Sequence, residues 1–326
     1  MTDVPETRHS LPAAGAVASW IEAHQDVGTV TGCVLWHRGL NDTYLIEADA
    51  GRYVLRLSRL FWRSEEEVAY EIAMLLHLGR HHDGVALPVA GKDGRFAGRL
   101  PTAEGHRIAV LFERAPGGVV QPAPRASRLL GRAAASVHRA AAGFTRQPAP
   151  FRLDLGHLLD QPLTQIRPFV RDRPDDVAFL DAFACELRGH VEAAKGSLEW
   201  GFCHGDIQFP NAHLDGDFVR LFDFDCCGEG WRSYDVAVYR WTLGSAPDAE
   251  QNWQCFLDGY RSVRALGDAD IRLVPVFVAL RAIWIRGLHT GNADDFGRAW
   301  LNEAYWDRFI GNLRAWRDRI RKDIEA

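Results

Sequence analysis

The chain has 326 residues, of which 47% are hydrophobic and 25% charged, a composition typical of globular proteins that excludes fibrous repeats and leaves room for two lobes. The formal net charge of -5 argues against nonspecific nucleic-acid binding, which depends on clustered basic side chains that neutralise phosphates. This balance is compatible with a cationic substrate, although solubility alone explains it better.

The first third of the chain has the pattern of an antiparallel sheet with flanking helices. Apolar residues at helical spacing predict a helix over residues 13–23. Period-two alternation between turn signals predicts strands at 32–36, 43–47, 53–57 and 106–112. Ser64, followed three residues later by Glu67, predicts a capped helix over 64–79.

The remainder of the chain is predicted to be mainly helical. A helix over 126–142 carries His138, which we interpret as a packing residue. Helical sequence also fills 148–195, whose carboxylates are interpreted as a solvated face. Asp215-Gly216 predicts a hairpin turn before a strand at 218–222.

Two features bear on location. The first residues lack an apolar core, and Arg281 interrupts the apolar run 273–285, so neither a secretory signal nor a membrane span is predicted. The six cysteines show no C-x-x-C pair and no metal-like spacing, so we expect thiols in a reducing compartment. Adjacent Cys226 and Cys227 are interpreted as apolar fillers, with a redox role less favoured. We therefore expect a cytoplasmic protein.

The segment CHGDIQFPN, residues 203–211, carries the strongest chemical signal. It places Asn211 five residues after Asp206, and Asp223 follows one short strand later. Phosphoryl transfer mainly requires positioned groups and neutralised charge. Asp206 would accept a hydrogen bond from a substrate hydroxyl, while Asn211 and Asp223 would supply hard oxygen ligands to Mg²⁺. The ordered set, rather than the common His-Gly-Asp tripeptide, indicates a phosphotransferase that uses ATP and Mg²⁺.

The spacing H-G-D-x-x-x-x-N resembles the protein-kinase catalytic loop H-R-D-x-x-x-x-N, with Gly205 in place of Arg. In this form it is similar to the aminoglycoside phosphotransferase and choline kinase superfamily, which type II homoserine kinases and bacterial stress-response kinases also resemble. The resemblance implies an α+β, two-lobed protein-kinase-like fold. It places a small antiparallel-sheet lobe at 1–114 and a larger, mainly helical lobe at 115–326, with a helical insertion at about 150–198.

The resemblance also implies nucleotide-binding residues in the first lobe. Arg56 stands where the superfamily carries the Lys that holds the α- and β-phosphates; a guanidinium can contact them bidentately but needs different positioning. An exposed strand Arg is the alternative. Glu71 is implied as its partner, and Glu67, better explained as a cap, is the other candidate. The loop that contains Gly39 and Asn41 would cover the phosphates, although no G-x-G-x-x-G is present. Phe112 and Glu113 would lie in the hinge that reads the adenine edge.

Three further residues complete the implied site. Asp235 is implied to brace the catalytic loop through backbone hydrogen bonds, with an N-cap as the competing explanation. His204 is assigned a structural role as well. Asp225 is interpreted either as a second Mg²⁺ contact or as a solvent-facing loop residue.

The implied activity is transfer of the ATP γ-phosphoryl group to a hydroxyl of a small polar, amine-bearing molecule, with no nucleic-acid or membrane partner. A Ser/Thr protein kinase of the stress-response type is one alternative. A nucleotide-binding pseudokinase regulator is another, suggested by Arg56 and the missing glycine-rich signature. We discount an aspartate-nucleophile phosphatase built on Asp223 and Asp225, because Cys227 stands where that motif requires Thr or Ser.

Overall fold

The computed structural model describes residues 7–119, 121–145 and 152–324. The chain divides into two compact units. Unit 1 consists of Met1–Gly118, Gly143–Pro150 and His213–Asp225, and unit 2 consists of Val119–Ala142, Phe151–Ala212 and Cys226–Ala326. The lobe boundary predicted near residue 114 stays a prediction.

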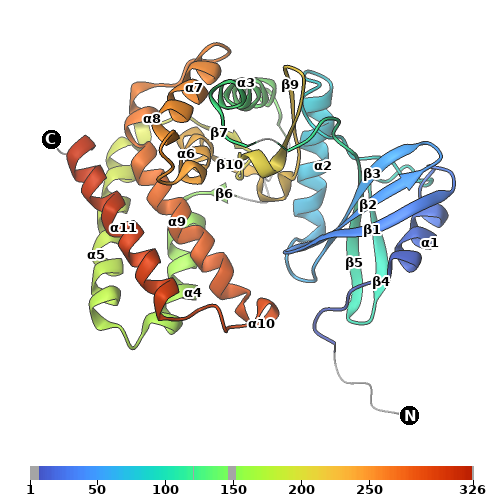
Figure 1. The fold of residues 1–326 in the computed structure, drawn as a ribbon, viewed down its shortest axis with the longest axis horizontal. Helices are drawn as coiled ribbons and strands as arrows, with labels where there is room; N and C mark the ends of the chain where they lie inside the picture. Colours follow the sequence, from blue (N-terminus) through green and yellow to red (C-terminus); the bar gives the residue numbers. More distant parts are fainter. Residues whose placement is uncertain (1–6, 120, 146–151, 325–326) are drawn as a thin grey trace. The chain divides into compact units, whose positions relative to one another are not determined.

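Unit 1 is built on a five-stranded antiparallel sheet (Figure 1). Its strands are β1 (Val30–Arg38), β2 (Asn41–Ala48), β3 (Gly51–Ser58), β4 (Ala97–Thr102) and β5 (Gly105–Glu113), in the order β1-β2-β3-β5-β4. The four strands predicted in this region are confirmed. The sequence analysis missed β4, because Gly98 and Pro101 are strand breakers; an edge strand tolerates them.

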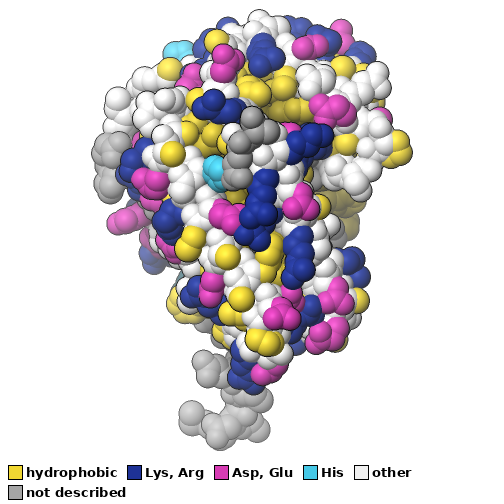
Figure 2. Space-filling view, turned by 90° about the vertical axis from the view of Figure 1, so that its left-hand side faces the viewer, with side chains coloured by type: hydrophobic (Ala, Val, Ile, Leu, Met, Phe, Trp, Pro, Cys, Tyr) yellow, Lys and Arg dark blue, Asp and Glu magenta, His cyan; other side chains and the backbone are white. Residues whose placement is uncertain are grey.

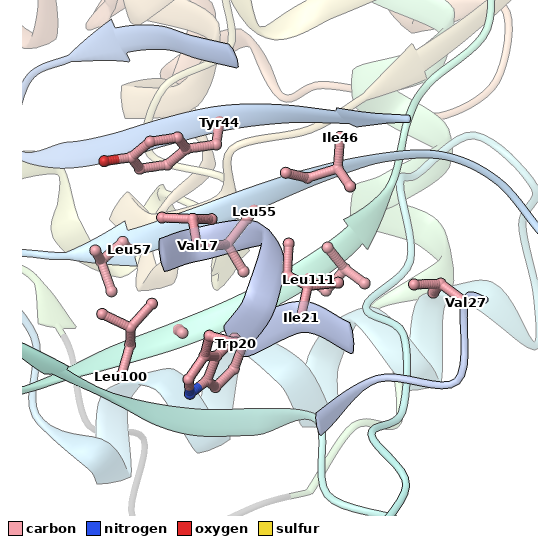
Figure 3. Close-up of a cluster of buried hydrophobic side chains, with 11 residues drawn as sticks. Val17, Trp20, Ile21, Val27, Tyr44, Ile46, Leu55, Leu57, Leu100 and Leu111 are labelled. Atoms are coloured by element: carbon pink, nitrogen blue, oxygen red, sulfur yellow. The ribbon is translucent and has the colours of Figure 1, made fainter. Parts of the chain in front are cut away.

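One face of this sheet is buried under helix α1 (Ala14–His24), as Figure 3 shows. Val17, Trp20 and Ile21 lie on one side of the helix because residues three and four apart share a face. They pack on every second residue of the central strands, namely Tyr44, Ile46, Leu55, Leu57, Ala109 and Leu111. The predicted N-terminal helix is confirmed.

Helix α2 (Glu65–Gly79) packs on the opposite face of the sheet, where Val68 and Ile72 contact Val110. The capping box predicted at Ser64 and Glu67 is present, since each side chain accepts a hydrogen bond from the other residue's backbone N–H.

A two-stranded hairpin completes unit 1, formed by β8 (Ala212–Asp215) and β9 (Phe218–Leu221). Its turn contains Gly216 with φ +60°, as the Asp-Gly signal predicts. Two backbone hydrogen bonds of Leu221, with Gly84 and Ala86, join the hairpin to the segment that follows α2. The sheet, the two helices and the hairpin thus form one unit.

Unit 2 is mainly helical and contains a three-stranded sheet in the order β6-β10-β7. The strands are β6 (Arg152–Leu153), β7 (Trp200–Cys203) and β10 (Gly228–Trp231). The α-helices are α3 (Pro124–Ala140), α4 (Gln161–Val170), α5 (Pro174–Ala194), α6 (Arg232–Leu243), α7 (Ala249–Arg261), α8 (Asp268–Arg272), α9 (Val274–Gly291), α10 (Ala293–Phe296) and α11 (Glu303–Ile324). A π-helical turn, Gly156–Asp160, precedes α4, and short 3₁₀ turns lie at Lys195–Ser197, Phe209–Asn211 and Phe224–Cys226.

Helices α3 and α7 cross at close range. A Cβ on Gly131 would lie 2.1 Å from the Phe256 carbonyl oxygen, and one on Gly259 would lie 1.9 Å from that of Arg128. Only glycine permits this approach. The crossing matters for the site because α3 and α7 each contribute a polar residue to the network that holds the catalytic loop.

Side chains of both charge signs are intermixed on the face of the molecule shown in Figure 2. Examples on α5 and α11 are the ion pair of Arg317 with Glu186 and the ion pair of Arg319 with Asp323. No helix in the described part of the chain is both long and apolar enough to cross a bilayer. The predicted α+β class, with an antiparallel N-terminal sheet and a mainly helical C-terminal region, is confirmed.

Candidate active site

The segment predicted to be catalytic is the loop after β7 in unit 2. Gly205 has φ +83°, and a Cβ there would lie 2.2 Å from the backbone oxygen of Cys226. An L-residue at this position would be strained and would clash with backbone. The structure thus gives a steric reason for Gly205 where protein kinases carry Arg.

Asp235 holds this loop through backbone hydrogen bonds. Its Oδ2 accepts from the N–H of His204 at 2.6 Å, and its Oδ1 accepts from the N–H of Gly205 at 2.7 Å. Asp235 is fully buried and lies within the first turn of α6, whose N-cap is Trp231. The N-cap explanation for Asp235 is therefore wrong.

His138 of α3 extends the network behind Asp235. Its Nε2 lies 2.8 Å from Asp235 Oδ2, and its Nδ1 lies 2.7 Å from the Tyr260 hydroxyl of α7. Burial lowers the pKa of His138 to about 4, so the ring is neutral at pH 7. Since Asp235 can only accept, Nε2 donates to it and Nδ1 accepts from Tyr260. The sequence analysis interpreted His138 as a packing residue and missed this contact.

The pKa of Asp235 reflects these donors. Burial alone would raise it, but the hydrogen bond and charge of His138, with the backbone hydrogen bond of Gly205, hold it below its ordinary value. The carboxylate stays ionised because three donors satisfy it.

Asp206 lies within a set of side-chain donors. Its Oδ2 accepts from Asn211 Nδ2 at 2.7 Å and from Gln208 Nε2 at 2.8 Å. Its Oδ1 accepts from Arg281 Nη2 of α9. His204 Nδ1 in turn accepts from the backbone N–H of Asp206 at 3.2 Å. The structure thus brings together three residues chosen from the sequence and adds Gln208 and Arg281.

Sequence reasoning missed Arg281 because it treated the residue only as a break in an apolar run. The missed signal was a charged side chain inside a helix that is otherwise apolar, because charged residues are rarely fully buried without a partner.

Unit 1 holds a second polar cluster, around Arg56. The Arg56 guanidinium, 5% exposed, donates to both carboxylate oxygens of Glu71, and its Nη1 lies 3.7 Å from Asp223 Oδ1. The exposed-Arg alternative is therefore wrong, and Glu67 is the cap rather than the partner. Burial alone would lower the pKa of Arg56, but Glu71, then Asp225 and Asp223, raise it, so the side chain stays cationic.

The two aspartates after β9 differ in surroundings. Asp223 has φ +62° and a side chain that is 44% exposed. Asp225 Oδ2 accepts from Asn41 Nδ2 at 2.7 Å and from Trp62 Nε1 at 3.1 Å. Burial alone would raise the pKa of Asp225, but the charges of Arg56 and Arg63 hold it below its ordinary value. Asp225 thus fastens neighbouring segments and is not the solvent-facing residue of the second interpretation.

Gly39 and Asn41 lie at the turn between β1 and β2, where the Gly39 N–H donates to the Asn41 carbonyl oxygen at 2.9 Å. The Asn41 side-chain amide is engaged by Asp225. The contact of this turn with phosphates stays a prediction.

A row of apolar residues crosses the sheet on the face opposite α1. Strand register places Val34, Leu45, Val54 and Phe112 side by side. Their strand neighbours belong to the cluster under α1, so the row faces the other way. Val34 is 60% exposed, and the Arg56 Cζ lies 5.1 Å from the Phe112 ring centroid. Glu113 ends β5, and its N–H donates to the Leu87 carbonyl oxygen at 2.9 Å.

The donor set can be tested against Mg²⁺. Among the described residues, no three His, Cys, Asp or Glu side chains gather at one place. Mg²⁺ rarely needs such a group, because it is bound by one or two protein oxygens together with waters and substrate phosphates. Asn211 uses its Nδ2 on Asp206, which leaves its hard amide oxygen, and Asp223 presents a half-exposed carboxylate. These oxygens fit the ion.

Comparison with known proteins identifies the class. The model of the phosphotransferase enzyme family matches residues 32–266. An uncharacterized protein of Deinococcus radiodurans is 40% identical over 316 residues, covering 95% of this chain and 92% of the relative. Amicoumacin kinase of Bacillus subtilis is 24% identical over 262 residues, covering 76% of each chain.

Two solved structures share the fold. A microcompartment-associated aminopropanol kinase has a TM-score of 0.76 at 24% identity, covering 93% of this chain and 95% of that one. An amicoumacin kinase in complex with AMP-PNP, Ca²⁺ and Ami has a TM-score of 0.75 at 20% identity, covering 93% of each chain.

The protein is thus a phosphotransferase, a small-molecule kinase with an alcohol group as acceptor. It belongs to the phosphotransferase enzyme family, and the resemblance drawn from residues 203–211 is confirmed.

Proposed function

We propose that this enzyme transfers the γ-phosphoryl group of Mg-ATP to a hydroxyl of a small polar, amine-bearing molecule. One observation carries the proposal: the Asp206 carboxylate is held by Asn211, Gln208 and Arg281, on a loop whose backbone is anchored by Asp235. A carboxylate fixed in this way can orient a hydroxyl and accept its proton late in the reaction, when the developing charge is greatest.

In this proposal, unit 1 binds the nucleotide. The apolar row of Val34, Leu45, Val54 and Phe112 offers a surface for the adenine base. Arg56, held as a fork by Glu71, offers a fixed cation for phosphate oxygens. The amicoumacin kinase structure contains a nucleotide analogue, which supports nucleotide use by this fold.

Asn211 and Asp223 would hold Mg²⁺ through their hard oxygens, and the bound ion would supply neutralisation of phosphate charge. The Ca²⁺ in the amicoumacin kinase structure supports a site for a hard divalent cation in this fold. Asp223 and Arg56 lie 3.7 Å apart, so a carboxylate for the metal and a cation for phosphate stand side by side.

The acceptor class rests on the relatives and on charge. Aminopropanol kinase is named for an amino alcohol. The net charge of -5 favours a cationic acceptor over an anionic one. All six cysteines are free thiols, and we place the reaction in the cytoplasm, where thiols stay reduced and ATP is abundant.

The test is a mass-spectrometric screen of purified protein with Mg-ATP and a panel of hydroxylated amines, amino acids and amino-hydroxy antibiotics. The Asp206→Asn variant is run beside it, since it keeps the shape of the side chain but removes its charge. A product heavier by one phosphoryl group, absent with the variant, is the expected result. An active Asp206→Asn enzyme would overturn the assignment of Asp206.

Two other outcomes point to the alternatives. Phosphate on the protein itself, lost on substitution of Asp206, would favour a protein kinase. Binding of ATP without transfer to any acceptor would favour a nucleotide-binding regulator.

A further inference from the structure

Arg281 is a buried cation in contact with the carboxylate to which the proposed function assigns the acceptor hydroxyl. It is 2% exposed, and its Nη2 donates to Asp206 Oδ1. Its Nη1 donates to the Gly205 carbonyl oxygen at 3.3 Å and to the Tyr234 hydroxyl at 3.2 Å. We propose, resting on that function, that Arg281 positions Asp206 for the acceptor and occupies the place beside it where a cationic group of the acceptor would otherwise bind.

The hydrogen bonds of Asp206 indicate where the acceptor hydroxyl docks. A carboxylate has about four acceptor positions, two on each oxygen. Among the described residues, Gln208 and Asn211 use both positions on Oδ2, and Arg281 uses one on Oδ1. The acceptor hydroxyl therefore donates to the second position on Oδ1, directly beside the Arg281 guanidinium.

Two tryptophans enclose the same guanidinium. The Arg281 Cζ lies 4.7 Å from the Trp284 ring centroid and 5.4 Å from that of Trp241. Trp284 is held in place because its Nε1 donates to His157 Nε2 at 2.7 Å. Aromatic faces next to a carboxylate form the environment in which proteins bind organic ammonium groups. Here Arg281 fills that environment itself.

This arrangement limits the acceptor. A second cation beside Arg281 would meet like-charge repulsion at short range in a site shielded from water. An amine on the carbon next to the reacting hydroxyl is therefore disfavoured. The amine of the acceptor lies farther along the molecule, and the part beside Asp206 is uncharged.

Arg286 provides a matched control on the same helix. It is partly buried, and its Cζ lies 5.0 Å from the Tyr305 ring centroid and 5.5 Å from that of Phe309. Burial lowers the pKa of Arg286, as it would for any guanidinium removed from water. Removal of Arg286 tests the loss of an aromatic-packed Arg from α9 without removing a contact to Asp206.

The experiment compares Arg281→Ala, Arg281→Lys and Arg286→Ala with wild type, using the acceptor found in the screen. We expect Arg281→Ala to lower kcat about a hundredfold, because Asp206 loses its orientation, while KM for ATP stays within about twofold. Arg281→Lys should lower kcat about tenfold, since one ammonium cannot replace the fork. Arg286→Ala should stay within a few fold of wild type.

Chemical rescue separates positioning from a structural role. Millimolar guanidinium chloride should restore much of the kcat of Arg281→Ala but not that of Asp206→Asn, whereas sodium chloride should restore neither. A structural defect would show instead as a lowered melting temperature without rescue. If Arg281→Ala does not fold, Arg281→Lys carries the test, and wild-type kcat in that variant would overturn the proposal.

Specificity is tested with 1-amino-2-propanol and 1,2-propanediol, which differ by an ammonium in place of a hydroxyl next to the reacting carbon. Wild type should prefer the diol in kcat/KM, and Arg281→Ala should shift the ratio toward the amine by about tenfold. An unchanged ratio together with unchanged kcat would overturn the inference. A wild type inert toward every acceptor would overturn the proposed function, and the inference would fall with it.

Discussion

The two polar clusters of this protein are built in different ways. In unit 2, Asp206 lies on a short loop whose backbone N–H groups bind Asp235, so its position depends on backbone geometry. In unit 1, Arg56 lies within a strand and is held by the carboxylate of Glu71, so its position depends on two long side chains. We therefore expect substitutions in the loop to lower kcat, and substitutions of the pair to act mainly on nucleotide binding.

Asp223→Asn should have the largest effect. Asp223 has φ +62°, a conformation that Asn also tolerates, so this substitution removes the charge and keeps the backbone. We expect kcat to fall about a thousandfold and the Mg²⁺ concentration at half-maximal activity to rise. The measurement is activity against Mg²⁺ concentration.

Asp225→Asn is the matched comparison for Asp223→Asn, because the Asp225 carboxylate accepts from Asn41 and Trp62. Its effect on the Mg²⁺ dependence should be smaller. An unchanged Mg²⁺ dependence in Asp223→Asn would remove that residue from the metal site.

Gly205→Ala should follow, with a kcat lowered about a hundredfold, because a Cβ 2.2 Å from the Cys226 oxygen must displace the loop. Gly216→Ala is the control: it also has positive φ, at +60°, but a Cβ there meets nothing within 4 Å. Its cost should be limited to about 1 kcal/mol of stability. Equal kcat losses in both variants would contradict the importance of the Gly205 contact.

Arg56→Lys should have a smaller effect. A lysine keeps the charge but cannot form the fork to Glu71, so we expect KM for ATP to rise about tenfold with little change in kcat. The control is Arg99→Lys in the exposed pair with Glu65, where little should change. Steady-state kinetics with ATP as the varied substrate measures both. A large fall in kcat with unchanged KM would break the distinction between the two clusters.

The sequence indicated those parts of the site that are close together along the chain. Asp206 and Asn211 are five residues apart, and a loop of that length fixes their spacing. Arg281 and Asp206 are 75 residues apart, and Asn41 and Asp225 are 184 apart, so their contacts depend on packing that no local pattern encodes. The fold was more accessible, because alternation and capping signals are local; only the edge strand β4, with its Gly and Pro, was missed.

The smallest expected effect concerns pH and the anchor of the unit 2 loop. The pKa of His138 is lowered from 6.5 to about 4, so between these values the unfolded chain binds a proton that the folded chain does not. The stabilisation is therefore complete above pH 6.5 and is lost as the pH falls toward 4. We expect the melting temperature to fall by several degrees from pH 7.5 to pH 5.

His138→Gln tests the source of this loss. Glutamine can still donate to Asp235, but it does not titrate, so the variant should melt a few degrees lower at pH 7.5 and lose less on acidification. His289, whose pKa burial also lowers to about 4, should account for part of the remaining loss. An equal pH-dependent fall in wild type and variant would mean that His138 is already protonated in the fold. In that case the pair with Asp235 would be an ion pair, and both clusters would rest on buried ion pairs.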